Sequence, residues 1–254
     1  MKITLDFRKT VEENAADYFE KAKKSKKKLE GAKKALQKSL ERLRETEEKA
    51  VLIEQPKIKK IKKSEWFEKF RWFVSSDGLL VIGGRDATTN EIVIKKYTEK
   101  GDLVFHTDMA GSPFVVIKSE GKKIPTATLK ETADFTATFS RAWKKGLGTT
   151  DVFYVGPEQV SKEANPGEYM PKGAFMIRGK TIYINSEISL GIGFYEEKVM
   201  SGPISAIKKH CKEFLTIIQG DKKPSDVAKV VQKKIGGDLD EIIRALPPGE
   251  CNIS

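Results

Sequence analysis

Two short pairs of polar residues could carry chemistry in this sequence. Arg85 and Asp86 follow an apolar run that ends in two glycines, and His106 and Asp108 stand at the end of a second apolar run. Residues two apart in a strand share a face, so His106 and Asp108 could point the same way. Two carboxylates and one histidine could hold a divalent metal ion for phosphodiester cleavage. A metal-dependent nuclease is therefore one hypothesis, and pairs that only organise loops are the alternative.

Other enzyme signatures are missing from the sequence. It contains no phosphate-binding loop of the GxxxxGKS or GxxxxGKT type, no GxGxxG after a strand, no GxSxG and no HExxH. The two cysteines, Cys211 and Cys251, cannot form a disulfide framework, and with only two histidines they give no zinc-finger spacing. We therefore predict no catalytic residue, no cofactor and no resident metal ion, in a protein of the reducing cytosol.

The stretch LLVIGGRDATTN, residues 79–90, predicts a buried strand that ends in a functional or structural loop. Gly83 and Gly84 permit backbone conformations closed to other residues and let the main chain approach a ligand or neighbour. Arg85 can bind a phosphate or a carboxylate through two nitrogens. Two interpretations stay open: an RNA-facing loop, or an internal clasp between Arg85 and Asp86 that holds the start of a helix.

A second loop has the composition of a nucleic-acid contact. In QVSKEANPGEYMPKGAFMIRGK, basic residues and one tyrosine stand among glycines, and such groups suit phosphates and unstacked bases of RNA. An internal salt bridge between Glu168 and Arg178 is the alternative. The RNA-binding candidates of the compact part of the chain are Arg85, Lys95, Lys96, His106, Lys162, Tyr169, Lys172, Arg178 and Lys180.

The positive charge of the chain is concentrated at its beginning. The net charge is +11, and residues 1–63 carry 20 Lys and Arg against 11 Asp and Glu, a net charge of +9. Six lysines lie within residues 21–28, and we include Lys24, Lys27 and Lys28 among the RNA-binding candidates. This distribution favours a polyanionic partner. A solvated helix surface without a partner is the alternative.

Residues 11–53 predict one long helix, because they contain no proline and are rich in Ala, Lys, Glu and Leu. Leucines and small residues recur at a spacing of three and four from Leu29 to Ala50, which is typical of a coiled-coil seam. We expect a second copy of the chain, or a missing part of the same protein, along this seam. No apolar run is long enough to span a membrane, and the first residues do not resemble a signal peptide.

After residue 63 the pattern changes to short strands and turns, which predicts an α+β domain over 64–200 with a mainly antiparallel sheet. The turn SSDG predicts a hairpin, and residues 125–146 predict one long packed helix. Thr89 or Asn90 is expected to cap a helix that ends near Tyr97. Residues 174–178 and 181–184 are expected to pair across a tight turn. Residues 201–254 predict a small helical extension, starting with a helix over 203–218.

Several motifs of this domain together resemble the C-terminal RNA-binding domain of the NFACT family, which includes eukaryotic NEMF and bacterial RqcH. They occur in order between residues 65 and 194: EKFRWFVSSDGLLVIGGRDATTNEIVIKKY, GDLVFHTDMAGSPFVVIK, IPTATLKETADFTATFSRAW and VSKEANPGEYMPKGAFMIRGK. The basic helix before them resembles the coiled-coil arm of that family, and the tail after residue 201 resembles archaeal members. Since the family has a large domain and a helix-hairpin-helix segment before the arm, we expect this chain to be the C-terminal part of a longer protein.

The resemblance implies a role in ribosome-associated quality control. Family members bind large ribosomal subunits that carry a stalled peptidyl-tRNA and recruit charged tRNA, while the ribosome performs the peptide transfer. The first hypothesis is therefore a non-catalytic module that binds rRNA and tRNA. The second is a protein-protein adaptor acting through the arm, since some bacterial relatives are described as fibronectin-binding. A metal-dependent nuclease is the third.

Overall fold

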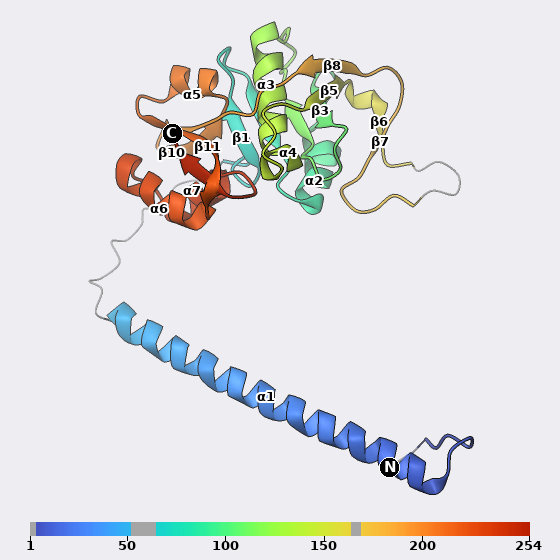
Figure 1. The fold of residues 1–254 in the computed structure, drawn as a ribbon. Coiled ribbons are helices and arrows are strands. Elements are labelled where there is room, and N and C mark those ends of the chain that lie inside the picture. Colours follow the sequence, from blue (N-terminus) through green and yellow to red (C-terminus); the bar gives the residue numbers. More distant parts are fainter. Residues whose placement is uncertain (1–3, 52–64, 164–168) are drawn as a thin grey trace. The chain divides into compact units, whose positions relative to one another are not determined.

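The computed structural model describes residues 4–51, 65–163 and 169–254. The chain divides into two compact units, Met1–Lys63 and Ser64–Ser254. We call the first unit the arm and the second the head, and each is described by itself (Figure 1). Among the described residues, no helix combines the length and the apolar character needed to cross a bilayer.

The arm contains the long helix that the sequence predicts. α1 runs over Val11–Val51 and is 41 residues long. It begins at a capping box, because Thr10 Oγ1 accepts the Glu13 amide at 3.2 Å and Glu13 Oε2 accepts the Thr10 amide at 2.8 Å. Four of its leucines expose more than half of their surface: Leu29, Leu36, Leu40 and Leu43. These leucines are exposed in the single chain, and pairing through the seam remains a prediction.

The head is built on a six-stranded antiparallel sheet, which confirms the predicted α+β class. Its strands, in spatial order, are β1 Arg71–Val74, β2 Leu80–Gly83, β4 Val115–Ile117, β3 Leu103–Thr107, β5 Asp151–Val155 and β8 Ile182–Asn185. The predicted SSDG hairpin joins β1 and β2, where the Gly78 amide donates to Ser75 O at 2.8 Å. Neighbouring strand residues such as Val81 and Ile82 are both fully buried, so both faces of the sheet are covered.

Three helices accompany this sheet where the sequence predicts two, and both predicted helices differ from the structure. α2 spans Ala87–Tyr97 and is capped by Asp86, not by Thr89 or Asn90. The helix predicted over 125–146 is divided into α3 Thr126–Thr138 and α4 Arg141–Lys144. Ser140 separates them because its hydroxyl accepts the Ala142 amide and so caps α4. α3 lies against β3, β4, β5 and β8 (Figure 1).

The predicted hairpin between residues 174–178 and 181–184 is wrong. β7 Met176–Ile177 pairs with β6 Val160–Ser161, which follows the short 3-10 helix η1 Pro157–Gln159, and β8 pairs with β5 instead. The connection between β7 and β8 is held by Gln159, whose Nε2 donates to Arg178 O at 2.8 Å and to Lys180 O at 3.0 Å. This long-range contact replaces the local turn.

The tail is less helical than predicted. Two strands, β9 Leu190–Tyr195 and β10 Lys198–Gly202, lead into the tail. The elements that follow are α5 Ile204–His210, β11 Phe214–Lys222, α6 Pro224–Ile235, α7 Leu239–Ala245 and β12 Cys251–Ile253. The helix predicted over 203–218 is wrong beyond His210, since FLTII, residues 214–218, forms the start of β11. In this strand Ile217 is buried and Ile218 is 45% exposed, the alternation expected of a half-covered strand.

The tail and the domain before it share a sheet. β9 to β12 form a four-stranded sheet in the order β10-β9-β11-β12. β10 also contacts β1 of the large sheet, and the Val74 amide lies 3.3 Å from Met200 Sδ. His210 Nε2 is 2.7 Å from Ser75 O. The boundary predicted at residue 200 therefore falls within β10, and Ser64–Ser254 is one compact unit.

Candidate nucleic-acid interface

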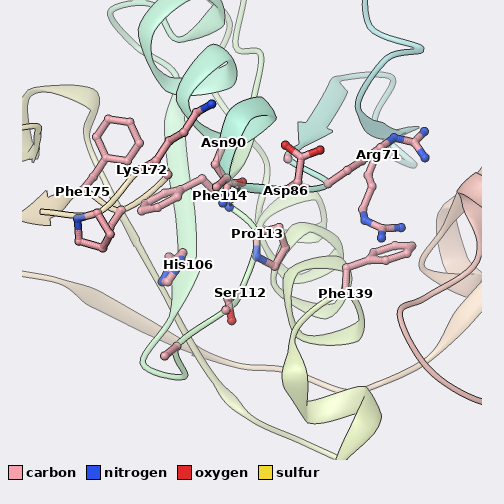
Figure 2. Close-up of a pocket in the computed structure, with 18 of the residues that line it drawn as sticks. Arg71, Asp86, Asn90, His106, Ser112, Pro113, Phe114, Phe139, Lys172 and Phe175 are labelled. Carbon is pink, nitrogen blue, oxygen red and sulfur yellow. Dashed lines mark hydrogen bonds between the residues drawn. The ribbon is translucent and has the colours of Figure 1, made fainter. Parts of the chain in front are cut away.

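A pocket of about 540 Å³ opens where the start of α2 meets two loops of the head. One loop follows β3 and contains MAGSP, residues 109–113, and the other is the PKGAF segment, residues 171–175. Figure 2 shows polar and aromatic side chains from all three segments around it. Its lining includes Arg71, Arg85, Asp86, Asn90, His106, Ser112, Phe114, Phe139, Lys172, Phe175 and Pro248.

The two glycines before Arg85 serve close packing. A Cβ on Gly84 would overlap the side-chain oxygen of Asn90, which accepts the Phe114 amide at 3.1 Å. A Cβ on Gly83 would stand 3.1 Å from Val115 Cγ2. Neither glycine has a positive φ, so the expectation of an unusual backbone conformation is wrong at both. Their role is to let β2 and α2 approach Phe114 and the adjoining strand β4.

Arg85 and Asp86 have separate partners, so the predicted clasp between the two side chains is wrong, whereas the RNA-facing loop stays a prediction. Asp86 Oδ1 accepts the Thr89 amide at 2.8 Å, which caps α2 and lowers the pKa of Asp86. Arg85 donates to Arg244 O at 2.7 Å and to Phe70 O at 2.8 Å. The clasp is thus between Arg85 and main-chain oxygens of distant segments, while the side chain still lines the pocket.

Arg71 stands beside Arg85 in the same wall. It donates to Leu246 O at 3.1 Å, and its guanidinium carbon lies 4.3 Å from the centre of the Phe139 ring. Burial and the nearby charge of Arg85 lower the pKa of Arg71 to about 9. Burial and the charge of Arg244 lower the pKa of Arg85 to about 10. Both groups are positively charged at neutral pH, so this wall of the pocket is cationic.

The PKGAF segment is fixed to α2 by Lys162 and Glu91. Lys162 Nζ donates to Ala174 O at 2.8 Å and to Pro171 O at 3.0 Å, and it lies 2.8 Å from Glu91 Oε1. Glu91 also accepts the Gly173 amide, and the bond from Lys162 lowers the pKa of Glu91 to about 2. These contacts occupy the ammonium group of Lys162, so this residue positions the loop that carries Lys172 and Phe175.

His106 belongs to an aromatic wall of the pocket. Its ring centre is 4.3 Å from that of Phe114, and Phe114 stands edge-on to Phe175 at 5.2 Å. His106 Nδ1 is 2.6 Å from Thr107 O, and burial lowers the pKa of the ring. A neutral imidazole next to two phenyl rings forms an apolar, aromatic surface at neutral pH.

The residues proposed as metal ligands are engaged elsewhere. Asp86 caps α2, and Asp108 accepts a hydrogen bond from the Tyr183 hydroxyl at 3.1 Å. Within the part of the chain that the structure describes, no group of three or more His, Cys, Asp or Glu could hold a metal ion. The hypothesis of a metal-dependent nuclease thus has no ligand set among the described residues, and the alternative of groups that organise loops describes Asp86 and Asp108.

The lowered pKa of His106 makes head stability depend on pH. In the unfolded chain a histidine has a pKa of about 6.5. Below this pH the unfolded chain therefore binds more protons at His106 than the folded head does. Neutral His106 therefore contributes to the free energy of unfolding fully above about pH 6.5. This contribution is lost as the pH falls from there toward the pKa of His106 in the folded head. Replacing His106→Gln should remove a slope of at most about 1.4 kcal/mol per pH unit. Urea denaturation of both proteins at several pH values measures this, and equal slopes would contradict it.

Residues of the head match a known protein family. Residues 69–179, which include most of the pocket lining, match the family described as NFACT protein RNA binding domain. The chain is 45% identical over 204 residues to the archaeal Rqc2 homolog aRqcH of Methanocaldococcus jannaschii, a match that covers 77% of this chain and 30% of the relative. The chain belongs to the NFACT family.

Two eukaryotic relatives extend this comparison. The NFACT chain is 38% identical over 187 residues to human ribosome quality control complex subunit NEMF, which covers 71% of this chain and 17% of the relative. It is 34% identical over 163 residues to ribosome quality control complex subunit 2 of Schizosaccharomyces pombe, over 63% of this chain and 16% of the relative. This chain therefore spans less than a third of the length of these relatives.

The remaining predicted RNA-binding residues of this NFACT chain lie on exposed surface. Lys95 pairs with Glu91 at 3.2 Å. Arg178, 54% exposed, lies near Glu163, and its predicted partner Glu168 is outside the described residues. Tyr169 is 88% exposed. The others are also exposed: Lys96, Lys172 and Lys180 in the head, and Lys24, Lys27 and Lys28 on α1. Of all the candidates, only Arg85, His106 and Lys172 line the pocket.

Sequence reasoning missed Arg71 and the phenylalanines of the pocket. Arg71 stands inside the run EKFRWF, whose density of aromatic residues favours an interpretation as the start of a core. That interpretation is right for Phe70, Trp72 and Phe73, all of which are buried. One signal could have marked Arg71 as a candidate: it is a single positive charge within a buried strand. A buried charge needs hydrogen-bond or ion-pair partners.

Proposed function

We propose that this chain is the RNA-binding module of a ribosome-associated quality control factor. It binds rRNA or tRNA on large ribosomal subunits that carry stalled peptidyl-tRNA, acts in the cytoplasm and is not itself an enzyme. The observation that carries this proposal is the match of residues 69–179 to an RNA-binding domain, over the segments that form the cationic and aromatic pocket. Relatives named as ribosome quality control subunits support the cellular setting.

The distribution of charge supports contact with a polyanion. The arm has a net charge of +9, and the described lysines of residues 21–28 are all exposed along α1. Exposed Lys172, Arg178 and Lys180 add cations to the head. Flexible ammonium and guanidinium groups on exposed surface suit phosphate contacts, which position a protein on RNA without reading sequence.

A protein-protein adaptor remains the second candidate because of one observation. Leu29, Leu36, Leu40 and Leu43 are more than half exposed on α1, and their spacing is that of a coiled-coil seam. A partner helix would cover them. Capture of the same protein partners from nuclease-treated and untreated lysate would favour this candidate.

RNA affinity of the whole chain should fall steeply with salt. Binding through six or more phosphate contacts releases counterions, and affinity should drop by about a thousandfold or more between about 50 and about 200 mM salt. Filter binding with tRNA across this range measures the slope. Affinity that is undetectable at the lowest salt, or unchanged with salt, would contradict the proposed function.

A pair of matched variants tests whether the arm takes part. Replacing Lys24, Lys27 and Lys28 with glutamine should reduce the steepness of log affinity against log salt concentration by up to about three. The control variant replaces three exposed lysines of α6 with glutamine and so removes the same amount of charge from the head: Lys229, Lys233 and Lys234. A loss of slope confined to the first variant supports contact by the arm, whereas equal losses would show that only net charge matters.

A further inference from the structure

The pocket of the head has two chemically different ends. Figure 2 shows Phe175, Lys172, Phe114 and His106 toward one side of it, Arg71 and Phe139 toward the other, and Asp86 between them. One end thus offers rings and an exposed ammonium, and the other end offers guanidinium groups. A ligand that fills the whole pocket must combine an aromatic part with an anionic part.

The guanidinium groups of the cationic end are held by main-chain oxygens, and Asp86 is the carboxylate whose charge acts on Arg85. Arg71 and Arg85 donate to main-chain oxygens of Leu246, Phe70 and Arg244, and neither forms an ion pair with a carboxylate among the described residues. Arg85 Nε is buried and has no hydrogen-bond partner. A buried donor without a partner is costly, and two adjacent guanidinium groups repel each other. An anion bound at this end would offset the repulsion between the two guanidinium groups.

The aromatic end is preformed. Phe114 contacts both His106 and Phe175, and Lys162 Nζ, which holds the loop, lies 4.9 Å from the Phe175 ring centre. Phe175 and His106 are only half-buried, so part of each ring faces the pocket. Such surfaces bind planar bases by stacking, with little dependence on base identity.

We propose that this pocket binds one unstacked nucleotide of RNA, with its phosphate at Arg71 and Arg85 and its base against Phe175 and His106. This inference rests on the proposed function and gives it a defined site. A pocket of about 540 Å³ lies within the usual size range for small ligands. Asp86 between the two ends repels additional phosphates, so a nucleoside monophosphate fits the pocket better than a triphosphate.

The test uses the whole chain and a single-stranded RNA of uridines with one central 2-aminopurine, whose fluorescence is quenched by stacking. Binding should quench the probe, and AMP should displace it more effectively than adenosine or ATP. Phe175→Leu keeps an apolar side chain but removes the ring face, and it should weaken binding about fivefold or more. Lys172→Gln should weaken binding, whereas Lys122→Gln, at a lysine that does not line the pocket, is the matched control.

The outcomes separate this inference from the proposed function. In the first outcome the RNA binds with steep salt dependence, but Phe175→Leu and Lys172→Gln bind it as well as the control and AMP does not compete. The pocket is then not the binding site, and only the inference fails. If the RNA does not bind at low salt, the proposed function fails with it. Phe175→Ala, confirmed as folded by its thermal transition, provides a second variant that removes the whole Phe175 ring from contact with the base.

Discussion

Replacing Lys118→Met should lower the free energy of unfolding of the head by about 3–5 kcal/mol. Lys118 Nζ lies 2.5 Å from Asp102 Oδ2, and their side chains are 9% and 1% exposed. The same ammonium donates to Tyr97 O at 2.8 Å. Removing it leaves the Asp102 carboxylate buried without its counter-charge, which costs far more than the loss of a surface ion pair. Urea denaturation followed by tryptophan fluorescence measures the change.

Two further variants test the cause. Lys122→Met removes a lysine that is 67% exposed and pairs with Glu120, and it should change stability by at most about 0.5 kcal/mol. Adding Asp102→Asn to Lys118→Met should restore part of the loss, because it removes the unpaired charge. Asp102 Oδ1 also accepts the Ser119 amide at 2.9 Å, and asparagine can keep this bond. A loss below about 1 kcal/mol in Lys118→Met would contradict a buried ion pair.

The elements that the sequence predicts well are those whose signals are local. The arm helix follows from composition alone, and its start at the Thr10 capping box adds a local signal. The SSDG hairpin follows from four residues, since Gly78 takes the positive φ that its turn needs. The α+β class also follows, because strand and helix patterns alternate along the head.

The wrong predictions concern contacts between distant segments. Residues 174–184 have the local pattern of a hairpin, but η1 supplies Gln159 to bridge Arg178 and Lys180, and each strand pairs elsewhere. The pattern of residues 203–218 fits a helix locally, whereas β9 and β12 offer strand partners to residues 214–218. Tertiary pairing overrides local preference in both places.

The site was only half predictable for the same reason. Arg85, His106 and Lys172 were found from their motifs, because glycines and polar clusters mark loops that can bind ligands. The partners of Arg85 are Phe70 and Arg244, and the latter is 159 positions away in the sequence. No spacing rule could place Arg71 and Arg85 in one wall, since β1, the residues after β2 and the end of α7 meet there only in the fold.

Replacing Phe73→Ala should lower the stability of the whole head by about 3–5 kcal/mol, including the tail. Phe73 is fully buried in β1, and its ring centre is 4.8 Å from that of Phe135 on α3. It also packs on the tail, because a Cβ on Gly202 of β10 would stand 2.9 Å from Phe73 Cβ. Loss of this ring leaves a cavity between the two sheets and α3.

Amide hydrogen exchange distinguishes one cooperative unit from two. If the head unfolds as one unit, the slowest amides of β2 and of α6 should exchange faster by the same factor in Phe73→Ala. Val230→Ala, at a residue of α6 that is 42% exposed, should leave both nearly unchanged. If β2 is destabilised while α6 keeps its protection, the tail folds independently and the two sheets are separate units. Because Arg85 and Arg71 bind carbonyl oxygens of residues 244 and 246, one cooperative unit also means that the tail holds the cationic wall of the pocket in place.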